Sequence, residues 1–447
     1  MAASATSTVD VARLLDERAI SALQLLVALL SACIMFVDGY DVTVMALAVP
    51  VIAREWAITP PHFSYALSAV LLGLSGGAAL FAPLGDRAGR RPLLIIAMLL
   101  VGVATTATAS STSPLQFVVW RLLTGIAMGI SIPNCNAWTA EYAPTRSRAT
   151  ILVVMNAAIG AGSFCAGFIA PVIFAHWGWR GAFLVGGAAP VLIGLAILVA
   201  GPESLKFLAV RRPDDPRIPG ILARIAPELG PLTRLHHPES APQASRWSLL
   251  GLLRPLLQLL GPLYRRRTLV LWGLVGMNLF TLYVLISWLP TLLQSDGWPL
   301  DDALRGAVLI QAGGIIGGVL LSLFLSRGQT LPALGIAFLA TAMCLVLFRA
   351  AGFAASWFVL ALIGGGTSGS QLALNALSTA YYPPAVKATG MGGAGVIGNI
   401  VAFLAPLAGG WAIERGFSAV NILAMLAVLP ALCALGVLLM RREWQWN

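Results

Sequence analysis

Three charged residues, Asp38, Asp41 and Arg121, lie inside stretches that are otherwise apolar. Charge is costly in such a segment, so each residue is a candidate for function. Asp38 and Asp41 are three positions apart, which places them on one face of a helix. Two acids beside one base are neutralised only in part, and like charges raise the proton affinity of the second acid. We expect proton coupling at Asp38 and Asp41, and the spacing leaves open which of them carries the proton.

Arg121 has two further interpretations. A guanidinium binds a carboxylate through a two-pronged contact, so Arg121 is a candidate to hold an anionic substrate. It could also alternate, held by an aspartate when the protein is empty and by the substrate when it is loaded. The plainest alternative is a static charge cluster that only joins two helices.

The elements that position these residues follow from composition. The chain has 447 residues, of which 58% are hydrophobic and 10% charged, with a mean hydropathy of +0.86. So few charges could not cover a water-facing surface, which excludes a soluble enzyme and a disordered scaffold. The sequence predicts an all-α membrane protein with twelve transmembrane helices in two six-helix bundles. The spans are expected near 20–46, 62–82, 93–111, 115–138, 150–173, 181–200, 268–291, 303–325, 331–350, 355–380, 388–410 and 419–440.

The segments between the spans are short, apart from one polar central loop at 201–267. This divides the chain into a terminus at 1–19, a bundle at 20–200, the loop, a bundle at 268–440 and a terminus at 441–447. With both termini in the cytoplasm, only five of the 28 Lys and Arg residues lie outside: Arg54, Arg180, Arg305, Arg349 and Arg415. Cytoplasmic loops carry this excess, so the net charge of +10 indicates topology and not nucleic-acid binding.

The two halves look like copies of one another. Pro144–Thr150 reads P-T-R-S-R-A-T, and Pro384–Thr389 reads P-A-V-K-A-T, each after the fourth span of its half. Gly85-Asp86-Arg87 has a degenerate counterpart at Leu325-Ser326-Arg327, in which only the arginine is kept. Repeated six-helix halves are typical of two-bundle transporters, whose substrate site lies between the halves near the membrane midplane.

This layout resembles the major facilitator superfamily. Ala82–Arg91 resembles its G-x-x-x-D-R-x-G-R-R motif, with Ala82 in place of the usual glycine. Trp120–Gly125 resembles its R-x-x-x-G motif, and Gly201–Ser204 resembles its P-E-S motif. The resemblance implies that the charges beside the second span act in gating, as a latch between helix ends. The gating candidates are Asp86, Arg87, Arg90, Arg91, Glu141, Arg146 and Arg148, and Glu141 is expected to pair with Arg146 or Arg148 or with the arginines after the second span.

Within that superfamily, three features resemble the aromatic acid:proton symporters. They are Asp38-Gly39-Tyr40-Asp41, Pro133-Asn134 followed by Glu141, and Asn278–Leu293 with the pattern N-L-x-x-L-Y-x-x-x-S-W-L-P-T-L-L. One departure is Asn399, where the family often carries arginine. The substrate carboxylate is therefore expected to face the first bundle near Arg121, and its ring the second.

The second half shows no ionisable residue deep in any span, so its contribution must be polar and aromatic. Aromatic rings offer a stacking surface, and amides bond hydroxyls or carboxylates. The remaining substrate-binding candidates are Tyr40, Asn278, Tyr283, Trp288, Gln311, Gln371, Asn375 and Asn399. The alternatives are packing, interhelical hydrogen bonds and, for Trp288, a place in the aromatic belt at the membrane interface.

The sequence thus predicts a proton-coupled importer of a small aromatic carboxylate, of the benzoate or hydroxybenzoate type, in a bacterial-type inner membrane. The partners expected are the carboxylate, H⁺ and the lipid bilayer, without nucleic acid, and the monomer is expected to be functional. Neither a cofactor nor a metal is expected beyond the proton, because the five cysteines form no C-x-x-C pair and no nucleotide motif appears. A transporter of another organic anion, and an efflux pump, remain open. A receptor or a membrane enzyme is less favoured, because no signalling domain or catalytic constellation appears.

Overall fold

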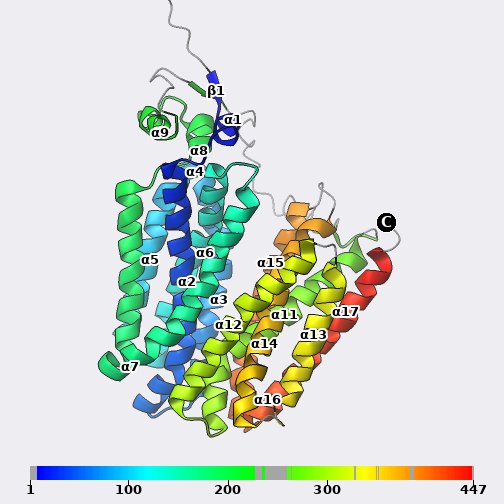
Figure 1. The fold of residues 1–447 in the computed structure, drawn as a ribbon. Helices are drawn as coiled ribbons and strands as arrows, with labels where there is room; N and C mark the ends of the chain where they lie inside the picture. Colours follow the sequence, from blue (N-terminus) through cyan, green and yellow to red (C-terminus); the bar gives the residue numbers. More distant parts are fainter. Residues whose placement is uncertain are drawn as a thin grey trace, which may run out of the picture.

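The computed structural model describes residues 8–226, 234–236, 259–262, 264–326, 329–348, 350, 352–382 and 387–444 (Figure 1). Among these residues, eleven helices are long and apolar enough to cross a membrane. The first bundle contains α2 (Ala22–Glu55), α3 (Ser64–Leu80), α5 (Arg90–Ala109), α6 (Pro114–Tyr142) and α7 (Arg148–Ala200).

Helix α7 accounts for the difference between eleven helices and the twelve expected spans. It has 53 residues, and Gly178 within it has a non-helical backbone with φ 63° and ψ −178°. A straight helix of that length would measure about 80 Å, against about 30 Å for the hydrocarbon core of a bilayer. Two crossings joined at Gly178 fit the spans expected at 150–173 and 181–200, so the twelve-span fold is confirmed.

The second bundle contains α11 (Arg265–Ser295), α12 (Leu300–Ser326), α13 (Thr330–Leu347), α14 (Phe353–Tyr381), α15 (Lys387–Glu414), α16 (Ala419–Leu426) and α17 (Val428–Trp444). The span expected at 419–440 is divided into α16 and α17 at Ala427. Arg327, Arg349 and Pro384–Val386 lie outside the described residues, so the second-half copies of the loop motifs are not seen.

Local chemistry fixes where several helices begin. Ser21 and Gln24 cap the start of α2 with a reciprocal pair of side-chain bonds. Ser113 accepts from the Gln116 N–H at the start of α6, where Pro114 occupies the first helical position. These caps satisfy backbone donors that a helix start would otherwise leave without partners.

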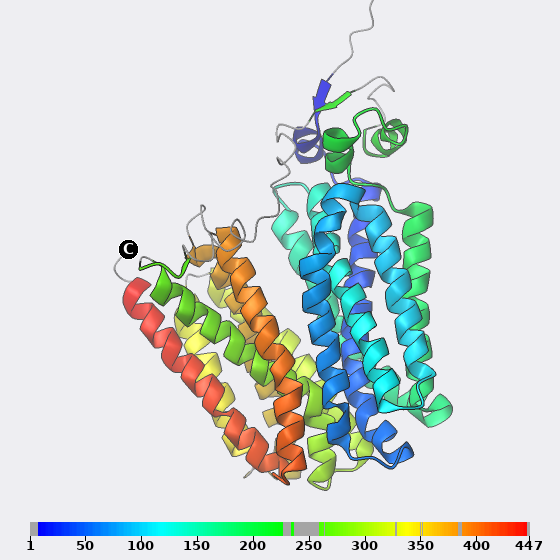
Figure 2. The ribbon, with the colours of Figure 1, turned by 180° about the vertical axis from the view of Figure 1, so that it is seen from behind.

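Five short elements lie together at one end of the molecule, which we call the terminal end (Figures 1 and 2). Here lie β1 (Thr8–Asp10), α1 (Val11–Asp16), α8 (Leu205–Arg211), α9 (Ile218–Ile225) and β2 (Arg234–His236). The strands β1 and β2 pair in parallel, with Thr8 opposite Arg234. The expectation of helices alone missed this pairing, which adds six strand residues to an otherwise helical fold. Three further one-turn elements are η1 (Pro60–Phe63), η2 (Ala82–Leu84) and α4 (Gly85–Ala88).

The buried apolar residues show how the bundles meet. At the terminal end each bundle has its own cluster, one around Met98 and Trp138 and the other around Trp272 and Phe338. A third cluster, around Trp288, combines residues of both bundles. It lies at the other end, which we call the closed end, where α2, α3 and α7 contact α11, α15 and α12. The ribbons diverge from there toward the terminal end in both views (Figures 1 and 2).

Candidate functional site

The intramembrane arginine pairs with one of the two aspartates. Arg121 on α6 donates through Nη1 to both carboxylate oxygens of Asp41 on α2, at 3.0 and 2.8 Å. The side chains are 0% and 2% exposed. The ion pair joins α2 to α6 and lies entirely within the first bundle.

Three threonines complete the surroundings of Arg121. Its Nη2 donates to Thr105 at 3.3 Å, Thr108 at 3.0 Å and Thr124 at 3.0 Å. Thr105 in turn donates to Asp41 Oδ1 at 3.1 Å. The guanidinium also lies 5.2 Å from the centre of the Phe183 ring, within cation–π range. Arg121 is therefore enclosed in this state, and its contact with a substrate carboxylate, which would require the ion pair to open, stays a prediction.

Asp38 has different surroundings from Asp41, although it is one turn away on the same helix. Its side chain is 3% exposed. Neither carboxylate oxygen has a hydrogen-bond partner in the structure. An ionised carboxylate buried without a partner is strongly disfavoured, so these surroundings suit the neutral acid. The structure thus separates the roles that the sequence left joined: one aspartate is a counter-ion, and the other is an unpartnered acid.

The two residues between these aspartates explain how α7 packs against α2. A Cβ added at Gly39 would lie 1.9 Å from the Ile159 carbonyl oxygen, so only glycine permits this approach. The Tyr40 hydroxyl donates to the Ala182 carbonyl at 3.3 Å. Tyr40 thus points into the first bundle, and its contact with substrate stays a prediction.

Three of the amide candidates come together in the second bundle. Asn278 on α11 donates to Gln371 Oε1 at 2.9 Å and to the Thr367 carbonyl at 3.1 Å. Gln371 on α14 donates to Asn375 Oδ1 at 3.1 Å. Asn278 is buried, whereas Asn375 is exposed. The chain of amides therefore runs from inside the bundle to an accessible side chain.

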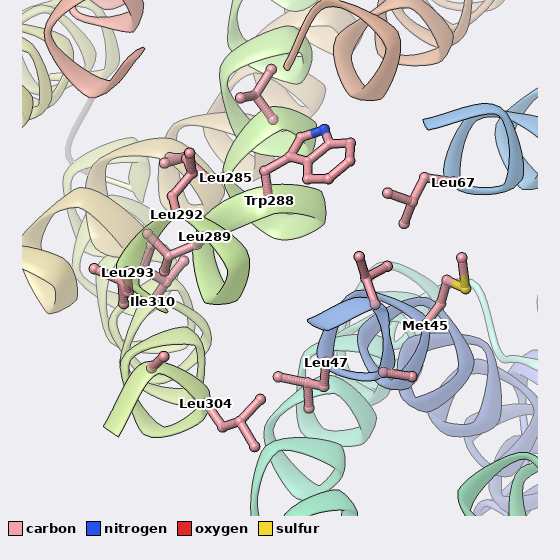
Figure 3. Packing of buried hydrophobic residues seen from close by; sticks show 14 of the residues in the cluster. Met45, Leu47, Leu67, Leu285, Trp288, Leu289, Leu292, Leu293, Leu304 and Ile310 are labelled. Carbon is pink, nitrogen blue, oxygen red and sulfur yellow. The ribbon is translucent and has the colours of Figure 1, made fainter. Parts of the chain in front are cut away.

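The remaining candidates also differ in how far their side chains are buried. Trp288 is fully buried in the cluster shared by the bundles, and its Nε1 donates to the Pro406 carbonyl at 2.9 Å (Figure 3). In this state it packs between α11 and α15 and is not part of an interfacial aromatic belt, and its contact with substrate stays a prediction. Tyr283 and Asn399 are partly exposed. Gln311, also partly exposed, lines a pocket between the bundles with Thr43, a residue that no sequence motif singled out.

The gating candidates form a cluster at the terminal end. Arg90 donates to Asp86, to Asn134 Oδ1 at 3.1 Å and to Glu141 Oε1 at 3.5 Å. The partner of Glu141 is therefore Arg90, which follows the second span and was one of the alternatives left open.

The other gating candidates make separate contacts. Arg146 donates to the Arg18 carbonyl at 2.8 Å, Arg148 to the Ala143 carbonyl at 3.4 Å and Arg91 to the Leu198 carbonyl at 2.6 Å. Arg87 is exposed. These contacts all lie in the first half of the chain, and the role of this cluster as a latch between helix ends stays a prediction.

Glu203, from the P-E-S segment, lies beside this cluster and caps the start of α5. Its Oε1 accepts from the backbone N–H groups of Arg90 at 3.0 Å and Arg91 at 3.3 Å, at the start of α5. Burial raises the pKa of Glu203, and the backbone N–H groups of Ser204, Arg91 and Arg90 offset part of that rise. Gly89 has φ 105°, and a Cβ there would lie 2.4 Å from Glu203 Oε2, so this position of the motif requires glycine.

Comparison with known proteins identifies the family. The model of the Major Facilitator Superfamily matches residues 31–406. A gallate transporter of Pseudomonas putida is 33% identical over 428 residues, covering 95% of this chain and 93% of that protein. The 4-hydroxybenzoate transporter PcaK of Acinetobacter baylyi is 30% identical over 439 residues, covering 97% and 95%.

Solved structures agree on the fold. The xylose transporter XylE of E. coli, in an inward open conformation, matches with a TM-score of 0.70 at 16% identity, covering 93% of this chain and 95% of that one. The nucleoside transporter NupG matches with a TM-score of 0.70 at 15% identity, covering 94% and 99%. The relatives are membrane transporters and not enzymes. With its two bundles, its charged motif after the second span and its aromatic-acid-transporting relatives, this chain belongs to the major facilitator superfamily.

Proposed function

We propose that this protein is a proton-coupled importer of small aromatic carboxylates in a bacterial inner membrane. The relatives support the substrate class, because gallate, 4-hydroxybenzoate and benzoate appear in their names. The single observation that carries the coupling is Asp38, a buried acid with neither oxygen hydrogen-bonded. A site of this kind can take up a proton in one state and release it in another.

Charge distribution supports the orientation. The terminal end carries the arginines after the second span and in the loop between α6 and α7, so we place it in the cytoplasm. The closed end then faces the outside, and the structure is an inward-facing state. Rocking of the bundles about the site between them would open the other side.

Proton coupling would offset the electrical cost of importing a carboxylate anion. A monovalent anion that enters against an inside-negative potential costs about 2.3 kcal/mol per 100 mV. One proton carried with it removes that cost, and two make entry favourable. In our proposal Asp38 carries a proton, while Asp41 is the counter-ion of Arg121, whose Nη1 lies 2.8 Å from Asp41 Oδ2.

Reconstituted transport tests this division of roles. Vesicles with an imposed pH gradient should accumulate labelled 4-hydroxybenzoate when they contain the wild-type protein. Asp38→Asn should lose this accumulation and keep exchange of internal for external substrate, because an amide mimics the neutral acid and exchange needs no net proton movement.

Two outcomes would contradict the proposal. Gradient-driven accumulation at the wild-type level in Asp38→Asn would show that the proton travels elsewhere. Exchange of aliphatic but not aromatic carboxylates by the wild-type protein would show that the substrate class is wrong. Ser131→Ala serves as a matched control and should keep both activities, because Ser131 is also buried in the first bundle but its hydroxyl donates to the Met128 carbonyl of the same helix at 3.0 Å.

A further inference from the structure

A small pocket lies between the two bundles beside the apolar cluster at the closed end. Thr43, Ala46 and Leu47 of α2 line one side of it, and Leu289 of α11 with Ile310 and Gln311 of α12 lines another. Leu47, Leu289 and Ile310 are also members of the shared cluster, and Figure 3 shows them approaching one another from the two bundles. The pocket thus lies where substrate would meet the closed gate.

Thr43 is the unusual residue of this pocket. Its side chain is 5% exposed, and its hydroxyl has no hydrogen-bond partner. Threonines within helices usually donate to the carbonyl four residues earlier, as Thr281, Thr341 and Thr367 do here at 3.0, 2.8 and 2.8 Å.

For Thr43 that carbonyl belongs to Gly39, and it already accepts from Ser163 at 3.0 Å. The Thr43 hydroxyl is therefore a buried polar group left without a partner beside a pocket. Such a group is unfavourable unless something binds to it.

We propose that Thr43 and Gln311 form a clamp that recognises a hydroxyl group on the ring of the substrate. The inference rests on the proposed aromatic carboxylate substrate and adds the residues that read its ring substituents. A hydroxyl and an amide can each donate and accept, as a phenolic group requires. The cavity measures about 10 Å³, which is room for a hydroxyl group and not for the ring, so the ring lies outside it against neighbouring apolar side chains.

The ring hydroxyl fits this pocket better than the carboxylate does. None of the residues that line the pocket is charged. A carboxylate buried there would lose its hydration without gaining a cation, whereas a neutral hydroxyl would find two partners. Arg121 does not line the pocket, and its guanidinium is enclosed by Asp41 and three threonines. The carboxylate therefore lies outside this pocket.

Three ligands separate hydroxyl recognition from general binding: 4-hydroxybenzoate, 4-methylbenzoate and benzoate. The methyl compound has nearly the shape of the hydroxyl compound but cannot form the hydrogen bonds. Calorimetry on the purified full chain should show that Thr43→Val weakens binding of 4-hydroxybenzoate by about 3- to 10-fold, as expected for one neutral hydrogen bond. Binding of 4-methylbenzoate and benzoate should stay within about twofold of wild type.

Gln311→Met should change the same ratio in the same direction, since methionine keeps the length of the side chain and removes the amide. Thr281→Val is the matched control, because the Thr281 hydroxyl is already bonded to the Met277 carbonyl. It should leave the selectivity for the hydroxyl compound unchanged.

The outcomes distinguish this clamp from the function on which it rests. A wild-type protein that binds none of the three ligands would overturn the aromatic carboxylate proposal and the clamp with it. A wild-type protein that binds them, with Thr43→Val keeping the same ratio of affinities or losing all three equally, would overturn the clamp alone.

Discussion

Asp38 and Asp41 lie three positions apart on α2, yet their surroundings give them different chemistry. Asp41 has a cation and a threonine hydroxyl as partners, whereas neither oxygen of Asp38 has one. A buried ion pair adds little net stability, because desolvation offsets the attraction. Removing one member is different, because it leaves the other charge buried and unpaired. At the scale of single residues, this predicts that the losses of stability from replacing Asp41 and Arg121 are strongly non-additive.

Arg121→Gln and Asp41→Asn should each destabilise the protein by about 3–5 kcal/mol, because each leaves one buried charge without its partner. The double variant leaves no charge at either position, so it should recover at least half of that loss. Thermal unfolding of the purified protein in detergent measures the effect. A double variant as unstable as the sum of the single variants would show that the pair does not act as a unit.

The residue types and spacing were enough to find the pair but not its detail. Charges in apolar stretches identified Asp38, Asp41 and Arg121, and helix geometry placed the aspartates on one face. Which aspartate meets Arg121 depends on the rotation of α2 against α6, which spacing does not determine. Thr43 gave no signal at all, because threonine is common in helices and only the occupied Gly39 carbonyl makes it unusual.

At the scale of elements, residues distant in sequence cap the start of α5. Glu203 provides an acceptor for two backbone N–H groups there, 113 and 112 residues away along the chain. Trp138 and Tyr142 of α6 hold this segment by donating to the carbonyls of Pro202 at 3.1 Å and Glu203 at 2.5 Å. The P-E-S segment thus ties the ends of the third, fourth and sixth spans together.

The buried carboxyl group of Glu203, which caps α5, predicts how the stability of the protein depends on pH. Burial raises the pKa of Glu203 above its usual 4.5, so ionisation disfavours the folded state. Its contribution to stability is complete below that usual value and is lost as the pH rises through the raised pKa. Glu203→Gln keeps an acceptor and does not titrate. The melting temperature of wild type relative to Glu203→Gln should therefore fall as the pH rises above 4.5.

A control separates the charge of Glu203 from its hydrogen bonds. Glu203→Ala removes the acceptor and should be less stable than Glu203→Gln by about 1 kcal/mol at every pH, as for other helix caps. A melting temperature of wild type that rose relative to that of Glu203→Gln with increasing pH would contradict the prediction, because it would mean that the folded state lowers the pKa of Glu203.

Helix packing gives another prediction at this scale. Gly39→Ala should destabilise the protein by about 1–3 kcal/mol, because the new Cβ would lie 1.9 Å from the Ile159 carbonyl oxygen and force α2 and α7 apart. Gly76→Ala on α3 is the matched control, since a Cβ there meets nothing within 4 Å. It should be neutral or stabilising, because alanine favours helix. Equal melting temperatures for the two variants would contradict this account.

The sequence predicted the elements unevenly, for physical reasons. Long apolar runs gave the spans, because the bilayer imposes a length that few other structures meet. The join at Gly178 merged two expected spans into α7, since one glycine with φ 63° replaced a loop. The pairing of β1 with β2 was missed because it joins two three-residue segments more than 200 positions apart, without local periodicity.

At the scale of the whole molecule, the two bundles share one apolar cluster and keep separate ones at the terminal end. Contacts at the closed end include Ser68 Oγ, which donates to the Phe403 carbonyl at 2.9 Å. An outward-facing state must break these contacts. Their mostly apolar character suits that exchange, because such surfaces can separate and repack without leaving charges unpaired.

A cross-link at the closed end tests whether the contacts between the bundles there must break during transport. A Cβ at Gly410 would lie 3.0 Å from the Ser64 Cβ, so a small adjustment allows a disulfide between Ser64→Cys and Gly410→Cys. The oxidised double variant should lose transport, keep binding from the terminal side and regain transport on reduction. The two single variants are the controls. Transport at the wild-type rate after complete cross-linking would exclude opening at this end.

The pairing of β1 with β2 also bears on how the bundles are connected. It anchors the central segment to the first bundle as far as His236, and Leu259 packs in the apolar cluster of the second bundle, which leaves residues 237–258 between them. A chain of 22 residues can span at most about 75 Å, more than bundles that rock within one bilayer need to move. The length of this connection therefore sets no limit on the motion, and the surfaces at which the bundles touch determine its path. We expect the two halves, made as separate polypeptides, to reassemble into a protein that still transports.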